Sequence, residues 1–329
     1  MDVDGKLRPL YLLKILQDRT DEEHFLTTAQ LCRILEDEYG IKSFRTTIKS
    51  DVEVLQKAGL SVQCTRSTQN LYNYIEREFD VPELKILIDA VLSSKFITKT
   101  KSDQLVAKLM ELAGMYKAKE LKRNLIVDGR IKTENEQVYM IADAINEAIN
   151  SRKKIRFQKA EYNENKERVL HNNGEIYYFS PYSLVWDGDF YYVVGYSDKY
   201  QSIGSHRVDR IYKRPQIMEE DAIPPADDFD INAYVNTMFR MNNADRYEVE
   251  LQVDNQLMDA IVDKFGTGVT TYEYDHNSFC MIADVSVGTA FYNWIFGFQG
   301  KVRIKGPESV RIAYEERVRE AAAELIRQI

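Results

Sequence analysis

The stretch SPYSLVWDGDFYYVVGYSDKYQSIGSHRVDRIY, residues 180–212, decides the fold expected for the middle of the chain. Aromatic and apolar side chains alternate on both sides of an Asp187-Gly188 turn, which is typical of two strands joined in a β-hairpin. The alternating residues are Tyr182, Leu184 and Trp186 before the turn and Phe190, Tyr192, Val194 and Tyr196 after it. Beyond Gly204, the residues His206, Arg207 and Arg210 add positive charge beside this aromatic-rich sheet. The pattern predicts a site for an anion.

The same stretch resembles the WYL domain of bacterial transcriptional regulators. Tyr191-Tyr192-Val193 stands where the family has Trp-Tyr-Leu, so the first and third letters differ. The middle tyrosine, the spacing to Arg207 and Arg210, and the order of the flanking segments match. The resemblance covers essentially the whole chain. It implies an N-terminal DNA-binding domain, a WYL domain with an Sm-like β-barrel, and a C-terminal extension.

Composition bounds the class of protein. A chain of 329 residues, 44% hydrophobic and 29% charged, is expected to form two to four soluble globular domains. No apolar run is long enough to span a bilayer, and the first residues lack the apolar core of a signal peptide, so we expect a cytoplasmic protein without a membrane partner. The cysteines, Cys32, Cys64 and Cys280, are isolated in sequence and predict no metal site and no disulfide framework. We expect no cofactor.

The charge is unevenly spread along the chain. The formal net charge is −8, which by itself argues against a general nucleic-acid binder. Residues 41–66 nevertheless hold five basic and two acidic side chains, and 5 − 2 gives +3 in this segment. The basic residues are Lys42, Arg45, Lys49, Lys57 and Arg66, and the acidic ones are Asp51 and Glu53. A locally basic element in an acidic protein is suited to specific binding of DNA.

Residues 1–76 are predicted to form a winged helix-turn-helix domain. A helix over residues 6–18 is followed by a second one, which a capping box at Thr27 and Gln30 opens and Gly40 ends. A third helix follows Ser43 and runs to residue 58, with an apolar side expected from Phe44, Ile48, Val52 and Leu55. Strands over residues 60–64 and 71–76 make the wing. The segment SFRTTIKSDVEVLQKAGL also resembles the recognition helix of WYL-family regulators.

Positive and hydroxyl side chains lie off the apolar side of the third helix. They suit phosphate and base-edge contacts in a major groove, and the wing supplies one more arginine. The predicted DNA-binding residues are Lys42, Ser43, Arg45, Thr46, Lys49, Ser50 and Arg66. The alternative is a solvated helix face without a ligand. The position as third helix of the set, followed by a wing, favours DNA.

Residues 80–133 are predicted to be a helical connector. Pro82 suits the first turn of one helix, Ser102 is expected to cap another, and residues 116–126 continue the helical pattern. Their apolar faces serve either a dimer surface or packing within the chain, and periodicity does not separate the two.

Residues 135–222 and 230–329 are predicted to be two further domains. The first has an amphipathic helix over residues 138–149 and then short strands, for which the resemblance implies closure into an Sm-like barrel. The second has the order βαββαβ of a ferredoxin-like fold, followed by a long helix that starts at Pro307. The segment WIFGFQGKVRIKGPESV resembles the C-terminal extension of WYL regulators. The fold class is therefore multidomain α+β.

The predicted ligand site of the WYL-like domain combines tyrosines with cationic side chains: Tyr182, Tyr192, His206, Arg207 and Arg210. Arginine suits bidentate anion binding, and His206 would add a charge if it were protonated near pH 6 to 7. Residues three apart face opposite sides of a continuous strand, so Arg207 and Arg210 share a pocket only if the strand ends or bulges between them. The alternative is structural ion pairs with Asp209 or Asp187.

These patterns predict a DNA-binding transcriptional regulator, expected to be a homodimer on a double-stranded DNA operator. Its WYL domain is expected to sense an anionic effector such as a nucleotide or short nucleic acid. The sequence has no phosphate-binding glycine loop, no HExxH and no GxSxG motif, so we expect neither catalysis nor catalytic residues. Two alternatives stay open: an enzyme acting on a phosphorylated substrate in the same cleft, and a DNA-bound scaffold without an effector.

Overall fold

The computed structural model describes residues 3–123, 131–238 and 244–327. The chain divides into two compact units, Met1–Glu134 and Asn135–Ile329. Helices precede several separate sheets, so the predicted mixed α+β, multidomain class is confirmed. No helix in the described ranges has the length and apolar character needed to cross a membrane.

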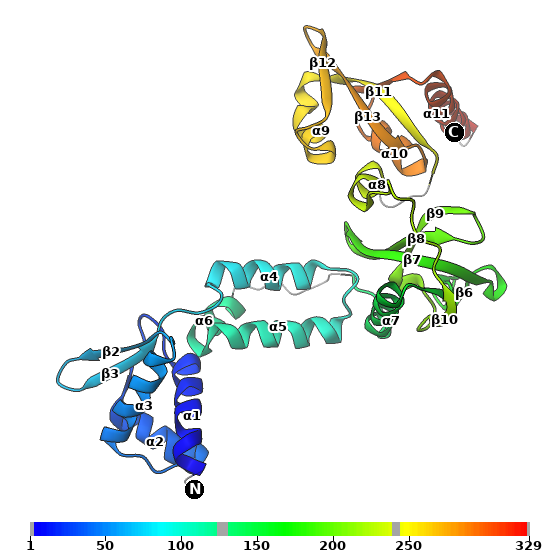
Figure 1. The fold of residues 1–329 in the computed structure, drawn as a ribbon. Coiled ribbons are helices and arrows are strands. Elements are labelled where there is room, and N and C mark those ends of the chain that lie inside the picture. Colours follow the sequence, from blue (N-terminus) through cyan, green and yellow to red (C-terminus); the bar gives the residue numbers. More distant parts are fainter. Residues whose placement is uncertain (1–2, 124–130, 239–243, 328–329) are drawn as a thin grey trace. The chain divides into compact units, whose positions relative to one another are not determined.

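The first unit begins with three helices and a small sheet (Figure 1). The predicted capping box at Thr27 and Gln30 is present, and Gly40 ends the second helix in the left-handed conformation. A two-residue strand that the sequence did not predict joins the hairpin, giving the antiparallel order β1-β3-β2. The elements are α1 (Val3–Arg19), β1 (Leu26–Thr27), α2 (Thr28–Tyr39), α3 (Arg45–Lys57), β2 (Val62–Arg66) and β3 (Asn70–Tyr74).

Helix α3 packs on α1 and α2 through Ile48, Val52 and Leu55, as its apolar spacing predicts. The prediction for Phe44 is wrong, because this side chain is 76% exposed. Phe44 is the residue before the helix and has extended backbone angles, so it does not follow the helical periodicity that would place it over the core. On the inner side of α3, Asp51 accepts hydrogen bonds from the guanidinium of Arg8 on α1.

Three further helices complete the first unit: α4 (Val81–Ser93), α5 (Lys99–Ala113) and α6 (Met115–Arg123). Pro82 lies in the first turn of α4, as predicted, behind a capping box made by Asp80 and Glu83. Thr98, not Ser102, caps α5, and Ser102 is buried inside the helix one turn later. The sequence does not distinguish the two candidate caps, because Thr98 and Ser102 both carry a hydroxyl and both precede the same apolar stripe. The last predicted residues of the following helix, 124–126, lie outside the described residues.

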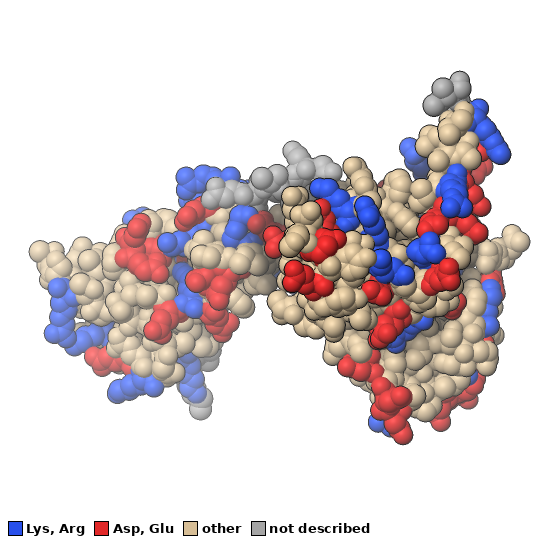
Figure 2. Space-filling model, turned by 90° about the horizontal axis from the view of Figure 1, so that it is seen from above, with Lys and Arg blue, Asp and Glu red and all other residues tan. Residues whose placement is uncertain are grey.

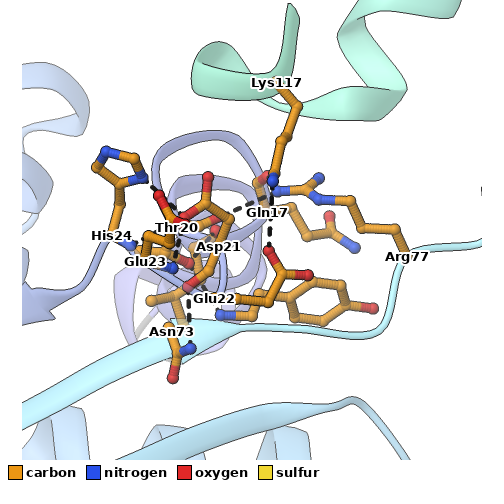
Figure 3. A network of polar contacts seen from close by, with 11 residues as sticks. Gln17, Thr20, Asp21, Glu22, Glu23, His24, Asn73, Arg77 and Lys117 are labelled. Atoms are coloured by element: carbon orange, nitrogen blue, oxygen red, sulfur yellow. Dashed lines mark hydrogen bonds and ion pairs between the residues drawn. The ribbon is translucent and has the colours of Figure 1, made fainter. Parts of the chain in front are cut away.

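Arg77, just after the hairpin, joins the three-helix part to the later helices (Figure 3). Its Nη2 donates to the carbonyls of Gln17 and Thr20 at 2.6 and 2.9 Å, and its Nη1 donates to the carbonyl of Leu112 at 3.3 Å. Gly114 makes room for this guanidinium, because a Cβ there would lie 2.6 Å from Nη2.

A second set of contacts strengthens the same junction. The imidazole of His24 stacks on the ring of Tyr116 at a centroid distance of 3.6 Å, and Nζ of Lys117 lies 3.9 Å from a carboxylate oxygen of Glu22. Because these contacts join α6 to the segment after α1, the helical part is held directly against the three-helix part within this unit.

The second unit begins with α7 (Val138–Ser151) beside a five-stranded antiparallel sheet of order β10-β4-β7-β8-β9 (Figure 1). The helix buries the predicted face, including Ile141, Ile145 and Ala148. The predicted strand over residues 176–180 and the first hairpin strand form one strand, β7. The strands are β4 (Lys153–Gln158), β7 (Ile176–Asp187), β8 (Phe190–Ser197), β9 (Ser202–Arg207) and β10 (Gln216–Asp221), with a separate pair, β5 (Ala160–Tyr162) and β6 (Arg168–Leu170). Closure into a barrel stays a prediction.

Gly195 in β8 allows β7 and β8 to approach closely. A Cβ at this position would lie 2.1 Å from the carbonyl oxygen of Ser180 and 2.9 Å from Cα of Pro181. The register between the two strands shifts immediately afterwards, between Pro181 and Ser183. The contact makes glycine necessary at this point of the sheet.

After a short helix that the sequence missed, α8 (Ile231–Thr237), the chain follows the predicted order βαββαβ. The four strands form an antiparallel sheet of order β12-β13-β11-β14, and α9 and α10 contribute to one core with its inward side chains, such as Leu251, Ile261 and Phe291. The elements are β11 (Arg246–Asp254), α9 (Met258–Phe265), β12 (Thr270–Asp275), β13 (Ser278–Ser286), α10 (Thr289–Gly297), β14 (Val302–Gly306) and α11 (Glu308–Arg327).

Candidate nucleic-acid interface and ligand pocket

The predicted DNA-binding residues gather around the start of α3 and the tip of the hairpin. Most are exposed, and Ser43 is half-buried: Lys42, Arg45, Thr46, Lys49, Ser50 and Arg66 form the exposed set. The exposed ring of Phe44 lies beside Arg45 at the helix start and is a candidate contact residue that the sequence analysis assigned to the core. The first-turn N–H groups of α3 also favour an anion at this end of the helix.

The acidic residues of α3 leave this face positive. Asp51 points inward to Arg8, whereas Glu53 lies near the face, with a carboxylate oxygen 3.9 Å from Nζ of Lys49. From α2, a carboxylate oxygen of Glu36 lies 3.8 Å from Nζ of Lys42. Within the described ranges, Arg45 and Arg66 form no ion pair. On the face of the molecule shown in Figure 2, Lys and Arg are interspersed with Asp and Glu, so attraction to an anion has to come from local groups of cations.

The five residues predicted to bind an effector do not converge on one point. The guanidinium of Arg207 lies 3.3 Å from the centroid of Phe190 and donates two hydrogen bonds to Asp209, whereas that of Arg210 lies over Tyr162 at 5.1 Å. Strand β9 ends at Arg207 and a 3-10 turn, Val208–Arg210, follows it. The ion pair with Asp209 is the one that the structural alternative expected.

The two tyrosines of the predicted site pack against apolar and aromatic side chains. The ring of Tyr182 lies 5.8 Å from that of Phe229, and Tyr192 is buried against Tyr234 and Val194. These tyrosines therefore position the segment that contains α8.

Only His206 of the predicted set lines a pocket of about 890 Å³, which lies along β9. This strand is at the end of the sheet order and pairs with β8 on one side. The pocket has a polar part and an apolar part, and its lining residues are Lys159, Ser197, Tyr200, Ser202, Ile203, Gly204, Ser205, His206, Phe229, Tyr234, Met238, Ala244, Asp245 and Arg246.

His206 is buried among aromatic rings. The centroids of Phe157, Tyr177 and Phe179 lie 5.3, 5.9 and 4.9 Å from that of its imidazole. Burial, helped by the nearby charge of Lys159, lowers the pKa of His206 to about 3. This lowered pKa argues against the expected protonation near pH 6 to 7, because the rings remove the water that would solvate an imidazolium. In the part of the chain that the structure describes, the Nε2 atom of the neutral ring has no hydrogen-bond partner, an arrangement that costs about 1–3 kcal/mol.

Lys159 completes the polar part of the pocket, and the sequence analysis missed it. Its Nζ lies 4.5 Å from the centroid of Tyr177 and has neither an ion pair nor a hydrogen bond to any residue that the structure describes. Burial, and then the charge of Lys199, lower the pKa of Lys159. The available signal was a lysine directly after the apolar strand of residues 154–158, but many surface lysines share that pattern.

Comparison with known proteins identifies the central domain. Residues 140–216 match the sequence profile of the WYL domain. No curated protein is significantly similar to the chain.

Two solved structures align with nearly all of the chain at low identity. One is the proteasome accessory factor B/C (PafBC) of Arthrobacter aurescens, with 15% identity, a TM-score of 0.31, and coverage of 96% of this chain and 48% of that one. The chain thus spans about half the length of that protein. The other is a CRISPR Cas-related protein, with 11% identity, a TM-score of 0.39, and coverage of 100% and 85%.

Proposed function

Because this chain is a WYL-domain protein, as its resemblance to the WYL regulators predicted, we propose that it is a DNA-binding transcriptional regulator whose WYL domain senses an anionic effector. The observation that carries the proposal is the exposed, locally basic start of α3 in a unit separate from the WYL domain. A recognition element and a sensing domain on one chain are the two parts that a ligand-responsive regulator needs.

The finer architecture belongs to the same proposal. We assign a winged helix-turn-helix to residues 1–76, a helical connector to 80–133, an Sm-like barrel to 135–222 and a ferredoxin-like domain to 230–329. The three-helix arrangement with the projecting hairpin β2–β3 supports the first assignment, and the sheet order β12-β13-β11-β14 supports the last. We assign no catalytic residue.

We propose that the regulator acts in the cytoplasm as a homodimer on a two-fold symmetric operator. A single recognition helix covers only a few base pairs, so two half-sites are needed for specificity. Retrieval of the genomic DNA bound by the full chain, followed by sequencing, tests this proposal. An enriched inverted repeat supports it, and the absence of any enriched sequence contradicts it.

The role of α3 is tested by the double variant Arg45→Ala/Lys49→Ala on the retrieved sequence. Loss of two phosphate contacts should reduce the slope of log affinity against log salt by about 1.8, at roughly 0.9 per contact. Lys57→Ala, which changes an exposed lysine at the opposite end of α3, is the matched control and should leave the slope unchanged. An unchanged slope in the double variant would remove α3 from the interface.

A turnover assay separates the enzymatic alternative. Release of phosphate or a dephosphorylated product from phosphorylated metabolites, at a rate abolished by Lys159→Gln, would replace regulation by catalysis. A scaffold without an effector would instead bind its operator identically with and without every ligand tested.

A further inference from the structure

We propose that the pocket along β9 binds a small organic carboxylate, with its charged group against Lys159 and His206 and an apolar or aromatic body against Phe229, Tyr234 and Met238. The inference rests on the proposed function in one respect, namely that this ligand is the effector of the regulator. It places the sensing site away from Arg207 and Arg210. Arg207 is paired with Asp209 and lies over the ring of Phe190, and Arg210 lies over the ring of Tyr162.

In the polar part of the pocket, Lys159 and His206 have no anionic partner among the described residues. Lys159 carries an ammonium group that is half removed from water and has no carboxylate partner among the described residues. His206 contributes a buried Nε2 that has no hydrogen-bond partner among the described residues, and only 7% of the residue is exposed. Buried polar atoms of folded proteins are almost always paired, so the unpaired Nε2 of His206 next to the half-buried ammonium of Lys159 points to a ligand. A carboxylate oxygen would accept from the ammonium, and from Nε2 in the tautomer that carries its proton there.

The other part of the pocket is apolar. Tyr234 and Met238 are buried in a cluster to which Phe229 and Ile203 also belong. All four line the pocket, so a ring or short chain would be placed against apolar side chains while its acid group reaches Lys159.

Charge and size select a small monoanion rather than a strand of nucleic acid. The described lining carries Lys159, Arg246 and Asp245, and 2 − 1 gives a net charge of +1, with His206 neutral. Binding of single-stranded nucleic acid depends on a row of cations along the backbone, which this lining does not provide. The volume of about 890 Å³ lies within the range of small-molecule sites. A single ammonium balances one carboxylate and would leave the second charge of a phosphate monoester unpaired.

The experiment titrates the full chain by calorimetry with a panel of aryl and alkyl carboxylates, such as phenylacetate, indole-3-acetate and octanoate. The matching amides, AMP and a thymidine tetranucleotide are the comparison ligands. We expect at least one carboxylate to bind and its amide to bind about 10- to 100-fold more weakly, because the amide lacks the charge. Failure of every carboxylate at millimolar concentration, or preferential binding of AMP or the tetranucleotide, overturns the proposal.

Variants of the pocket locate the binding. Lys159→Gln should weaken the carboxylate about 10- to 100-fold, and His206→Phe, which retains a ring within the aromatic cluster, should weaken it about 10-fold. The matched control is Lys199→Gln, because Lys199 lies over the same Tyr177 ring at 5.5 Å but is paired with Glu175 and does not line the pocket. Its effect should stay within about 3-fold. Equal losses in Lys159→Gln and Lys199→Gln overturn the placement.

Operator binding distinguishes the failure of this inference from that of the proposed function. Lys159→Gln should keep wild-type affinity for the operator while losing the response to the carboxylate. If the wild-type protein binds the carboxylate but no DNA, the pocket assignment is supported and the proposed regulatory function is contradicted. If it binds DNA but no carboxylate, the function stands and the pocket assignment falls.

Discussion

The start of α3 and the pocket along β9 both present cationic side chains, but they hold them in opposite surroundings. Arg45 and Lys49 are exposed, and water solvates their charges at little cost. Lys159 and His206 are partly or wholly removed from water, and burial lowers the pKa of both. An exposed cation is available to any anion, whereas a buried polar group is held there by the surrounding fold and suits one ligand. Substitutions at the start of α3 should therefore change DNA binding without changing stability, whereas substitutions at the pocket along β9 should change both ligand binding and stability.

The largest effect is expected in the sheet that forms the pocket. Gly195→Ala would place a Cβ 2.1 Å from the carbonyl oxygen of Ser180, so strands β7 and β8 must separate. We expect a loss of at least about 4 kcal/mol in the free energy of unfolding of the second unit, measured by chemical denaturation. Gly297→Ala is the control, because a Cβ there meets nothing within 4 Å. Similar stability of the two variants would contradict the close approach of the strands.

The second effect concerns the support beneath α3 rather than its binding face. Arg8→Met leaves the carboxylate of Asp51 buried without its partner and should lower the stability of the first unit by about 2–4 kcal/mol. Arg33→Met removes an exposed pair with Asp37 on α2 and should cost less than about 0.5 kcal/mol. Thermal unfolding of the two variants makes the comparison, and equal melting temperatures would show that the Arg8–Asp51 pair does not support the fold.

The third effect is a pH dependence that originates in the pocket. The pKa of folded His206 is about 3 and lies below the ordinary value of 6.5, so below pH 6.5 the unfolded chain takes up a proton that the folded chain does not. Stability is therefore complete above pH 6.5 and falls as the pH is lowered, by about 1.5 kcal/mol between pH 6.5 and 5.

Denaturation of wild type and His206→Phe at several pH values measures this contribution, since the other histidines are common to both proteins. The variant should show the smaller decrease on acidification. Parallel curves would mean that His206 takes up its proton over the same pH range in the folded and the unfolded chain, as protonation near pH 6 to 7 would require.

The smallest effect on stability is expected at the exposed end of α3. Arg45→Ala should change the free energy of unfolding by less than about 0.5 kcal/mol, because the side chain is exposed and has no ion pair among the described residues. Its affinity for the operator should nevertheless fall by about 10-fold. Denaturation and DNA binding measured on one preparation test this prediction. A loss of affinity that is explained by a loss of folded protein would contradict a direct role of Arg45 in DNA binding.

The local signals in the sequence located most of the elements. Capping at Thr27 and Gln30, the proline at the start of α4, and the alternation around residues 187–190 act within a few residues, so they can be read without the fold. Errors occurred where local signals compete, as at Ser102, or where an element is too short for periodicity, as at β1 and α8. Phe44 was misplaced because it directly precedes the helix whose period it was assumed to share.

The site residues also divide into those that local spacing locates and those that only the fold brings together. The face of α3 follows from helical spacing, because residues one turn apart share a side whatever the helix packs against. The pocket does not, since Lys159 and His206 are 47 positions apart and come together only through the pairing of β4, β7, β8 and β9.

The sequence by itself thus determined the mixed α+β class, the order of elements, the locally basic third helix and the resemblance to the WYL domain, all of which depend on short-range spacing and residue type. Only the tertiary structure decided which charges are buried. In it, Asp51 is paired with Arg8 and Arg207 with Asp209, and His206 is neutral beside Lys159, which has no ion pair among the described residues. Burial is a property of the packed chain, and it sets both the pKa of a group and the partners it can reach.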